Sequence, residues 1–420
     1  MTADSRSGPE QVSSDAEVCV VGAGPQALAV VTHLVTARPS LRDEIVVIDP
    51  SGEWLQTWQS QFDRLEIGVL RSPSVHHPAV DPGALSQYVA DKRMPRSNLP
   101  YDPPLTHVFT SFCNSIIESM QLRASVIAAR VISLDPAGHE RTRVTTTAGV
   151  FVARQLIWAG STRTPTVPAP IVELLAASPK IAHGSDVDLP NIGPLDGHHV
   201  IVVGGGLTAG HLAVGARARG ADVTLVTRRP IVERDFDVEP GWLGPRHLDG
   251  YSQLRSPTRR FEVAQTARGG GTMPSWMHRR LELEGSDGSI TNVVGEIESI
   301  AECGAGLDIR AGGQRINAGH CWLATGTRPD IRADIALGHL VDEHVDGIPV
   351  IDSSLRVSGT NVFMTGSLAT IELGPAAGNL WGARMAARKI CREITGTDLA
   401  PDATAIPTPG AVVSTAERST

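Results

Sequence analysis

The chain has 420 residues, of which 41% are hydrophobic and 20% are charged, a composition typical of two or three globular domains that each bury a core. Its net charge of −8 at pH 7 argues against binding nucleic acid or an anionic membrane by general electrostatic attraction. Because the chain shows neither a signal peptide nor an apolar run of the ~20 residues that a membrane-spanning helix needs, we expect a cytoplasmic protein.

The polar first and last segments, residues 1–15 and 401–420, lack apolar periodicity and are expected to be flexible tails. The five cysteines, at positions 19, 113, 303, 321 and 391, form no CxxC pair and show no metal-ligand spacing. They indicate free thiols in a reducing compartment and no bound metal ion.

Between the tails, short β-branched runs alternate with glycine turns and helical patterns, which predicts an α/β fold with parallel strands. The first such unit, AEVCVVGAGPQALAVVTHL (16–34), combines a buried strand, a turn and a helix. Its turn has the G-x-G-x-x-A spacing of a dinucleotide-binding site, formed by Gly22, Gly24 and Ala27. The next strand, 45–50, carries Asp49 at its end, where a carboxylate can accept hydrogen bonds from ribose hydroxyls.

A second unit of the same plan, HHVIVVGGGLTAGHLAVGA (198–216), follows about 180 residues later. Its turn contains Gly204, Gly206, Thr208 and Ala209. Here the next strand is followed by Arg228 and Arg229 instead of a carboxylate. Guanidinium groups bind a 2′-phosphate through paired charge-assisted hydrogen bonds, so this unit is expected to prefer NADPH to NADH.

A long segment, 236–280, follows the second unit and includes GWLGPRHLDGY and GGGTMPSW. It is too long for a tight loop in a compact domain, which predicts a helical excursion or a lid.

Three later stretches resemble motifs of the flavoproteins that have two dinucleotide-binding domains. LIWAGSTRTP (156–165) and CWLATGTRPD (321–330) are similar to the segments in which their chain passes between domains. NVFMTGSLA (361–369) resembles their late FAD motif, with Gly366 at the end of a strand. LGPAAGNLWGARMAARKI (373–390) would then form a helix whose N-terminus faces the flavin.

This resemblance covers nearly the whole chain and implies an α/β fold of two Rossmann-like domains, with the NADPH domain inserted in the FAD domain. Residues 16–165 and 328–400 would hold FAD, and residues 166–327, with the excursion, would hold NADPH. The same placement puts two tryptophans against the flavin, Trp54 and Trp58. It also brings Arg71 and His76 to the cofactor or substrate as candidate catalytic residues, and His77 with them, although adjacent histidines before a proline are typical of a surface loop.

FAD together with NADPH implies hydride transfer from the nicotinamide to the flavin. Disulfide reductases of this architecture need a redox-active cysteine pair, which this chain lacks. The chain resembles the class B flavoprotein monooxygenases, and within them most nearly the ornithine and lysine N-hydroxylases. In that family a flavin C4a-hydroperoxide, shielded by bound NADP⁺, delivers oxygen to a nucleophile. The resemblance therefore implies a monooxygenase that uses O₂ to oxygenate a soft nucleophile, above all the nitrogen of a small amine or amino acid.

Two other functions stay open. The chain could be an NADPH-dependent flavin oxidoreductase that passes electrons to a quinone or a protein partner, or a flavin-binding protein without catalytic activity. The sequence also departs from the N-hydroxylase pattern at Gly319 and Thr327, where that pattern has aspartate and tyrosine. Neither the substrate nor the oligomeric state follows from the sequence.

Overall fold

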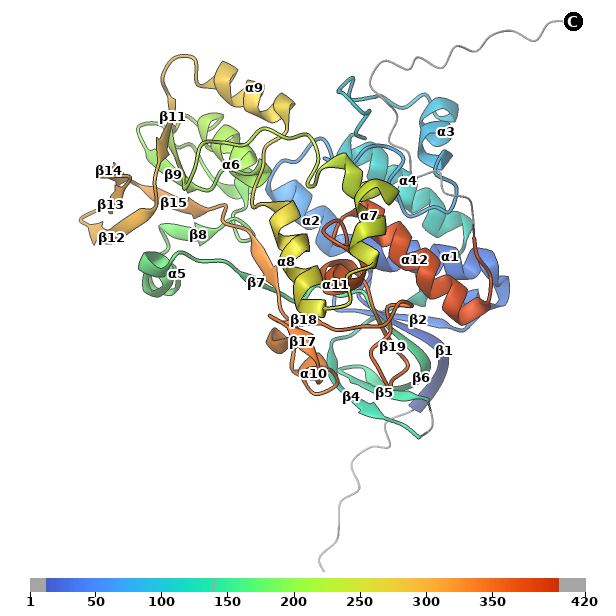
Figure 1. Ribbon diagram of the computed structural model, residues 1–420. Coiled ribbons are helices and arrows are strands. Elements are labelled where there is room, and N and C mark those ends of the chain that lie inside the picture. The colour runs from blue at the N-terminus through green and yellow to red at the C-terminus, as the bar shows by residue number, and fades with distance from the viewer. Residues whose placement is uncertain (1–12, 139, 400–420) are drawn as a thin grey trace, which may run out of the picture.

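Each of the two strand–turn–helix units lies at the centre of its own sheet in the computed structural model, which describes residues 13–138 and 140–399 (Figure 1). The first sheet has the strand order β3-β2-β1-β6-β5-β4, and β19 also pairs with β6. Its strands are β1 (Ser13–Val21), β2 (Ile45–Asp49), β3 (Val126–Ala128), β4 (Val131–Pro136), β5 (Thr142–Thr146), β6 (Gly149–Trp158) and β19 (Val362–Met364).

The two long strands β1 and β6 run parallel, and so do β2, β3 and β19 beside them. Only β4 and β5 are antiparallel, which forms a meander against the first half of β6. Because β19 pairs with the second half of β6, a strand from near the end of the chain completes a sheet that begins at Ser13.

The second sheet is entirely parallel, as expected for strands that are buried on both faces, and has the order β11-β10-β9-β15-β8. A separate antiparallel sheet, β12-β13-β14, follows β11 in the chain. The strands of these two sheets are β8 (Ile181–His183), β9 (His199–Val203), β10 (Asp222–Thr227), β11 (Ile290–Val294), β12 (Ile297–Cys303), β13 (Gly306–Ala311), β14 (Gln314–Ala318) and β15 (His320–Leu323). All of them lie between β6 and β19 in sequence, which confirms the expected insertion of one Rossmann-like unit in the other.

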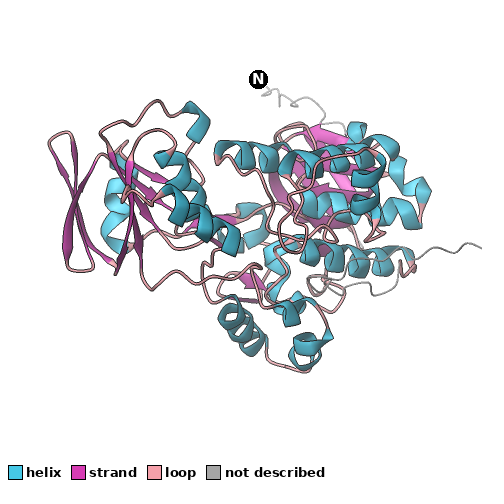
Figure 2. Cartoon of the chain, turned by 90° about the horizontal axis from the view of Figure 1, so that it is seen from above, coloured by secondary structure: helices cyan, strands magenta, loops and turns pink. Residues whose placement is uncertain are grey.

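Helices lie against the strands in both parts of the molecule (Figure 2). In the first part, α1 packs against α12, and nine side chains of α1 are buried in the core. The helices are α1 (Pro25–Ala37), α2 (Gln56–Arg64), α3 (Ala84–Asp91), α4 (Thr106–Ser119), α5 (Val172–Ala177), α6 (Leu207–Arg217), α7 (Pro245–Ser252), α8 (Pro257–Arg268), α9 (Ser275–Glu284), α10 (Ile335–Gly338), α11 (Thr370–Leu373) and α12 (Leu380–Thr395). Among the described residues, no helix is both long and apolar enough to span a membrane.

Two expected boundaries differ from the structure. The expected helix over 373–390 begins only at Leu380, because Gly374 has a φ of +82° and Pro375 follows it. The side chain of Asn379 caps the true start of the helix by accepting a hydrogen bond from Gly382 N at 3.0 Å. The first expected tail is shorter than predicted, since residues 13–15 already belong to β1; the rest of both tails lies outside the described residues.

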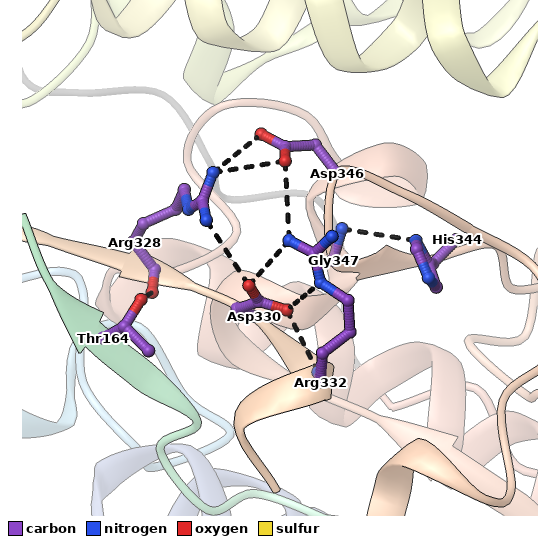
Figure 3. Close-up of polar contacts among 7 residues, drawn as sticks. All are labelled: Thr164, Arg328, Asp330, Arg332, His344, Asp346 and Gly347. Carbon is purple, nitrogen blue, oxygen red and sulfur yellow. Dashed lines mark hydrogen bonds and ion pairs between the residues drawn. The ribbon is translucent and has the colours of Figure 1, made fainter.

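The chain crosses between the two sheets through a short antiparallel pair, β7 (Arg163–Pro165) and β16 (Thr327–Pro329). Just after β16, the buried Asp330 accepts two hydrogen bonds from the guanidinium of Arg332, each at 2.7 Å, and one from Arg328 at 3.5 Å (Figure 3). Asp346 binds both of these arginines, at 3.2 and 3.6 Å. The hydrogen bonds from Arg332 hold the pKa of the Asp330 carboxyl below its ordinary value. This cluster ties the return crossing to the part of the chain that leads to β19.

The segment 236–280 contains α7, α8 and the start of α9. Although it leaves from the second sheet, it packs on residues that follow β19. The hydroxyl of Tyr251 donates to the carbonyls of Thr370 and Ile371, each at 2.9 Å, and Arg260 forms an ion pair with Glu372. A small apolar cluster completes this contact, with Val238, Leu243, Ala376 and Trp381 buried together. The excursion therefore joins the two halves of the molecule.

Candidate active site

The first glycine turn leaves open space above the N-terminus of α1. Gly22 has a φ of +95°, and a Cβ there would lie 2.9 Å from the backbone of Gly160, so only glycine fits. A Cβ on Gly24 would meet nothing within 4 Å. Ala27 is fully buried in α1. The turn thus offers unpaired helix N–H groups to a phosphate that approaches over Gly24.

Asp49 stands beside this turn, at the end of β2. One carboxylate oxygen accepts a hydrogen bond from Ala23 N at 2.9 Å, and the other accepts from the N–H and hydroxyl of Ser51 at 2.9 and 2.6 Å. These bonds fix the carboxylate within the turn that a dinucleotide would contact. The structure therefore brings Asp49 to the turn that contains Gly22, Gly24 and Ala27.

A cleft of about 380 Å³, open mouth included, leads from the first turn to Gly366. Gly366, with a φ of +63°, and Gly160 follow the paired ends of β19 and β6 and line the cleft together with Gln26. Two buried polar atoms at this place have no partner within the described chain, namely Gln26 Oε1 and the indole nitrogen of Trp158. A bound group with its own donors and acceptors would satisfy such atoms, and a flavin with its ribityl chain is of that kind.

Sequence reasoning missed Arg163, which also lines this cleft. Its guanidinium donates to the hydroxyls of Ser367 at 2.6 Å and Thr327 at 3.4 Å, and it forms no ion pair within the described residues. Although Arg163 is exposed, removal of water by the surrounding protein, and then the positive charge of Arg268, lower its pKa, while the charge of Asp237 raises it. An anionic group bound in the cleft would supply the missing counter-charge. The sequence signal that could have pointed to Arg163 is the Thr-Arg pair that both crossing segments contain, at 162–163 and 327–328.

The two tryptophans expected at the flavin are held by other protein groups. Trp54 is buried and donates its indole N–H to the carbonyl of Leu122 at 2.9 Å. Trp58 packs on the rings of Phe62 and Phe109, with centroids 4.2 and 5.4 Å away. Neither lines the cleft described above, and their contact with a flavin stays a prediction.

The second glycine turn has a backbone conformation similar to that of the first, but a different segment of the chain packs against it. Gly204 has a φ of +140°, and a Cβ there would lie 2.4 Å from the carbonyl oxygen of Ala324. A Cβ on Gly206 would lie 3.3 Å from the Cα of Gly271, so the excursion's return segment approaches this turn closely. Thr208 is exposed in the first turn of α6, and Ala209 is fully buried.

The two arginines follow β10 directly, and both are exposed. Arg229 donates a hydrogen bond to the carbonyl of Gly269, again in the return segment. Arg228 has no hydrogen bond or ion pair to any other described residue. One guanidinium is therefore free and the other is partly engaged at the place where a 2′-phosphate would bind.

Arg71, expected to contact cofactor or substrate, makes its hydrogen bonds to the excursion. Its Nε donates to Asp235 O at 3.0 Å, and its Nη2 donates to Arg234 O at 2.6 Å and Phe236 O at 2.8 Å. Thr272 accepts through its carbonyl and its hydroxyl, at 3.3 and 2.7 Å. The carboxylate of Asp237 completes the set with an ion pair at 3.0 Å. Arg71 thus fastens both ends of the excursion to the first half of the chain.

The two histidines that follow are buried, so their interpretation as part of a surface loop was wrong. His76 is 4% exposed and His77 is fully buried. Arg384 explains this burial, because its guanidinium binds the carbonyls of Val75 and Val80 at 2.6 and 3.0 Å and draws the loop inward. Burial lowers the pKa of His76 to about 3 and that of His77 to about 4, with a smaller contribution from Arg384. Both imidazoles are therefore neutral at physiological pH.

Comparison with known proteins points the same way as this geometry. Residues 16–241 match the sequence profile of the family described as pyridine nucleotide-disulphide oxidoreductase. A search of curated proteins found no match.

Among solved structures, the chain is similar to the FAD-bound cadaverine monooxygenase of desferrioxamine biosynthesis from Erwinia amylovora, with a TM-score of 0.73 and 15% identity over 94% of this chain and 97% of that one. It is similar to the ornithine N-hydroxylase of Kutzneria sp. 744, with a TM-score of 0.75 and 15% identity over 90% and 98% of the two chains. The bacillithiol disulfide reductase of Bacillus cereus is also similar, with a TM-score of 0.58 and 17% identity over 91% and 99%. At these identities the likeness concerns the fold, and it confirms the expected resemblance at that level.

Proposed function

This chain belongs to the pyridine nucleotide-disulphide oxidoreductase family, and from that premise we propose that it is an FAD- and NADPH-dependent monooxygenase that oxygenates the nitrogen of a small amine. The solved structures it resembles include a cadaverine monooxygenase and ornithine N-hydroxylases, and they support this choice within the family.

The open first turn fits FAD, and the arginines beside the second turn fit NADPH, although Gly271 packs closely over Gly206 there. FAD would lie over Gly22 and Gly24 with its ribose at Asp49, and its flavin end would enter the cleft beside Gly366 and Arg163. NADPH would lie over the second turn, with its 2′-phosphate at Arg228 and Arg229. Together they supply two electrons and the activation of O₂.

The observation that carries the proposal is the environment of the thiols. All five cysteines are free, and none lines either cavity at the junction of the two halves. Four are buried, and burial raises the pKa of Cys19 and of Cys321 to about 12, so neither is a reactive thiolate. Without a thiol pair beside the flavin cleft, a disulfide is a poor electron acceptor for this chain, and O₂ is the acceptor that needs no protein ligand.

The overall reaction would consume NADPH, O₂, a proton and the amine, and would release NADP⁺, water and the N-hydroxylated amine. One oxygen atom forms the new N–O bond, and the other leaves as water with the two electrons from NADPH. The role of the protein is to bind and orient the two cofactors and the amine, and to exclude solvent from them. Arg71 holds the excursion over the junction, and the neutral His76 faces the cavity there without adding charge.

The test is to supply the purified, FAD-saturated protein with NADPH, O₂ and a panel of small amines. We expect NADPH consumption that depends on the amine, with the N-hydroxylated product found in near-stoichiometric yield by mass spectrometry. Reduction of a quinone or partner protein without such a product would favour the electron-transfer alternative. Failure of NADPH to bleach the bound flavin would favour a non-catalytic flavin-binding protein.

A further inference from the structure

A second, small hollow, open to solvent at its mouth, lies where the excursion meets the first half of the chain. Three separate segments line it. The loop 71–76 provides one wall, the excursion provides a second with Phe236, Asp237, Val238 and Leu243, and Asn379 provides the third. Asn379 also joins this hollow to the flavin cleft, because Gln26, which lines that cleft, donates a hydrogen bond to its carbonyl at 3.2 Å. Substrate sites favour such junctions, next to a cofactor.

Arg71 is the only cation among the residues that line this hollow. A guanidinium has five N–H groups, and here the protein provides six acceptors for them, from Arg234, Asp235, Phe236, Asp237 and Thr272. Its charge is also compensated, since Asp237 lies 3.0 Å from Nη1. Arg71 therefore has no N–H group left for a ligand.

The remaining polar groups of the hollow are neutral or negative. The imidazole Nε2 of His76 is buried and has no partner within the described residues. The side chain of Asp237 is 37% exposed and makes a single ion pair in the described chain, with Arg71. Ser72 and Asn379 add neutral groups, while Pro73, Phe236, Val238 and Leu243 are apolar. An amine can find acceptors here, whereas a carboxylate would find no unpaired cation among the lining residues and would be repelled by Asp237.

We infer that this hollow is the substrate site and that it takes a small aliphatic mono- or diamine without an acidic group, in preference to an amino acid. The apolar wall from the excursion would pack on the carbon chain, and Asp237 and His76 would accept hydrogen bonds from the amine. The inference rests on the proposed function, and it narrows the substrate that this function leaves open.

Matched pairs of compounds test it, because cadaverine and lysine, like putrescine and ornithine, differ only by a carboxylate. For each compound, kcat/KM is measured from the N-hydroxylated product, and binding is measured from the change in the absorbance of the bound flavin. We expect each diamine to exceed its amino acid by about 100-fold, and the amino acids to leave the flavin spectrum unchanged at millimolar concentration.

A variant that adds a free cation sharpens the test. Ser72→Lys should reverse or abolish the preference, since the new ammonium can pair with a carboxylate and repel a diamine. Ser299→Lys, which adds the same charge on the exposed side of β12, should leave the preference unchanged.

Failure of this inference can be distinguished from failure of the proposed function. If lysine or ornithine is hydroxylated as well as its diamine, the proposed function stands and this inference is overturned. If no amine of either kind gives a product or perturbs the flavin, the proposed function fails and the inference with it.

Discussion

At the first glycine turn the space over the helix is open and a carboxylate stands beside it, whereas at the second turn the chain's own Gly271 closes in and arginines follow the strand. The two turns otherwise match. In each, the leading glycine has a positive φ and donates its N–H to the strand that follows, Gly22 to Ile48 at 2.8 Å and Gly204 to Val226 at 2.9 Å. The shared backbone creates a phosphate site, and the neighbours decide which dinucleotide it suits.

The largest effect is expected from a substitution at Gly24 in the first turn, where an added side chain would meet no protein atom. Gly24→Val should fold, because a Cβ there meets nothing within 4 Å, but it should weaken FAD binding by roughly 100-fold or more by filling the path of the pyrophosphate. Gly206→Val should instead retain FAD and lose thermal stability, since its side chain would displace Gly271. Flavin fluorescence titration and thermal unfolding distinguish the two variants. A Gly24→Val protein that keeps its flavin would contradict the proposed difference between the two turns.

The next effect concerns the excursion that covers the second turn. Arg71→Ala removes the donors for part-buried carbonyls, each of which costs up to about 1–3 kcal/mol when left unpaired, so the excursion should loosen. We expect several-fold more of the NADPH electrons to appear as hydrogen peroxide and trypsin to cleave the exposed Arg255 or Arg259 faster. Arg71→Lys should rescue little, because an ammonium has three donors and no planar fork.

Arg219→Ala is the matched control for this change. The side chain of Arg219 is 15% exposed, the same as that of Arg71, and it also spans the two halves, by binding Glu66 at 2.7 Å. It lines neither cavity. Equal peroxide release from Arg71→Ala and Arg219→Ala would show that general loss of stability, and not the excursion, explains the effect.

A smaller effect is expected at the strand end of the second unit. Arg228→Ala should lower the preference for NADPH over NADH by about tenfold, because it removes the guanidinium that no described protein group engages. Arg229→Ala should do less, since part of its hydrogen-bonding capacity already goes to Gly269. Steady-state kinetics with both coenzymes check this, and an unchanged ratio in the double variant would remove the basis for assigning NADPH to the second turn.

The last effect is a pH dependence of stability that buried histidines in both halves share. Burial lowers the pKa of His76 to about 3 and those of His33, His77 and His211 to about 4, from an ordinary 6.5. Between pH 6.5 and about 4 the unfolded chain binds protons at these sites and the folded chain does not, so the free energy of unfolding falls as pH falls. The slope is at most about 1.4 kcal/mol per pH unit for each histidine.

Denaturant unfolding between pH 7 and 4 measures this slope. His76→Gln should reduce it, and His339→Gln, at an exposed position, should not. A stability that stays level down to pH 4.5 would mean that these imidazoles are accessible to protons in the folded chain.

Much of the fold was predictable because its signals are local. Strand, turn and helix of each unit lie within about 20 consecutive residues, and the φ values of Gly22 and Gly204 follow from that pattern alone. The position of Asp49 is local too, since it lies 26 residues from its partner Ala23, in the next strand of the same unit. The insertion of one unit in the other followed from the order of the motifs.

The candidate site was less predictable, because its walls come from distant segments. Arg71 and His76 were named from the sequence, but no pattern showed that Arg71 binds carbonyls 163 or more residues away or that Arg384 buries His76. Arg163 was missed because its role depends on its hydrogen bond to Ser367, 204 residues later, and on its having no ion pair with any described carboxylate.

By itself, the amino-acid sequence determined two phosphate-binding turns, their different strand ends and their nesting, because backbone sterics and side-chain charge act within a single βαβ unit. The tertiary structure decided which charges remain free at the junction. A charged side chain can bind a ligand only with hydrogen-bond donors that other protein groups do not already use. The number of such donors depends on residues that folding brings together.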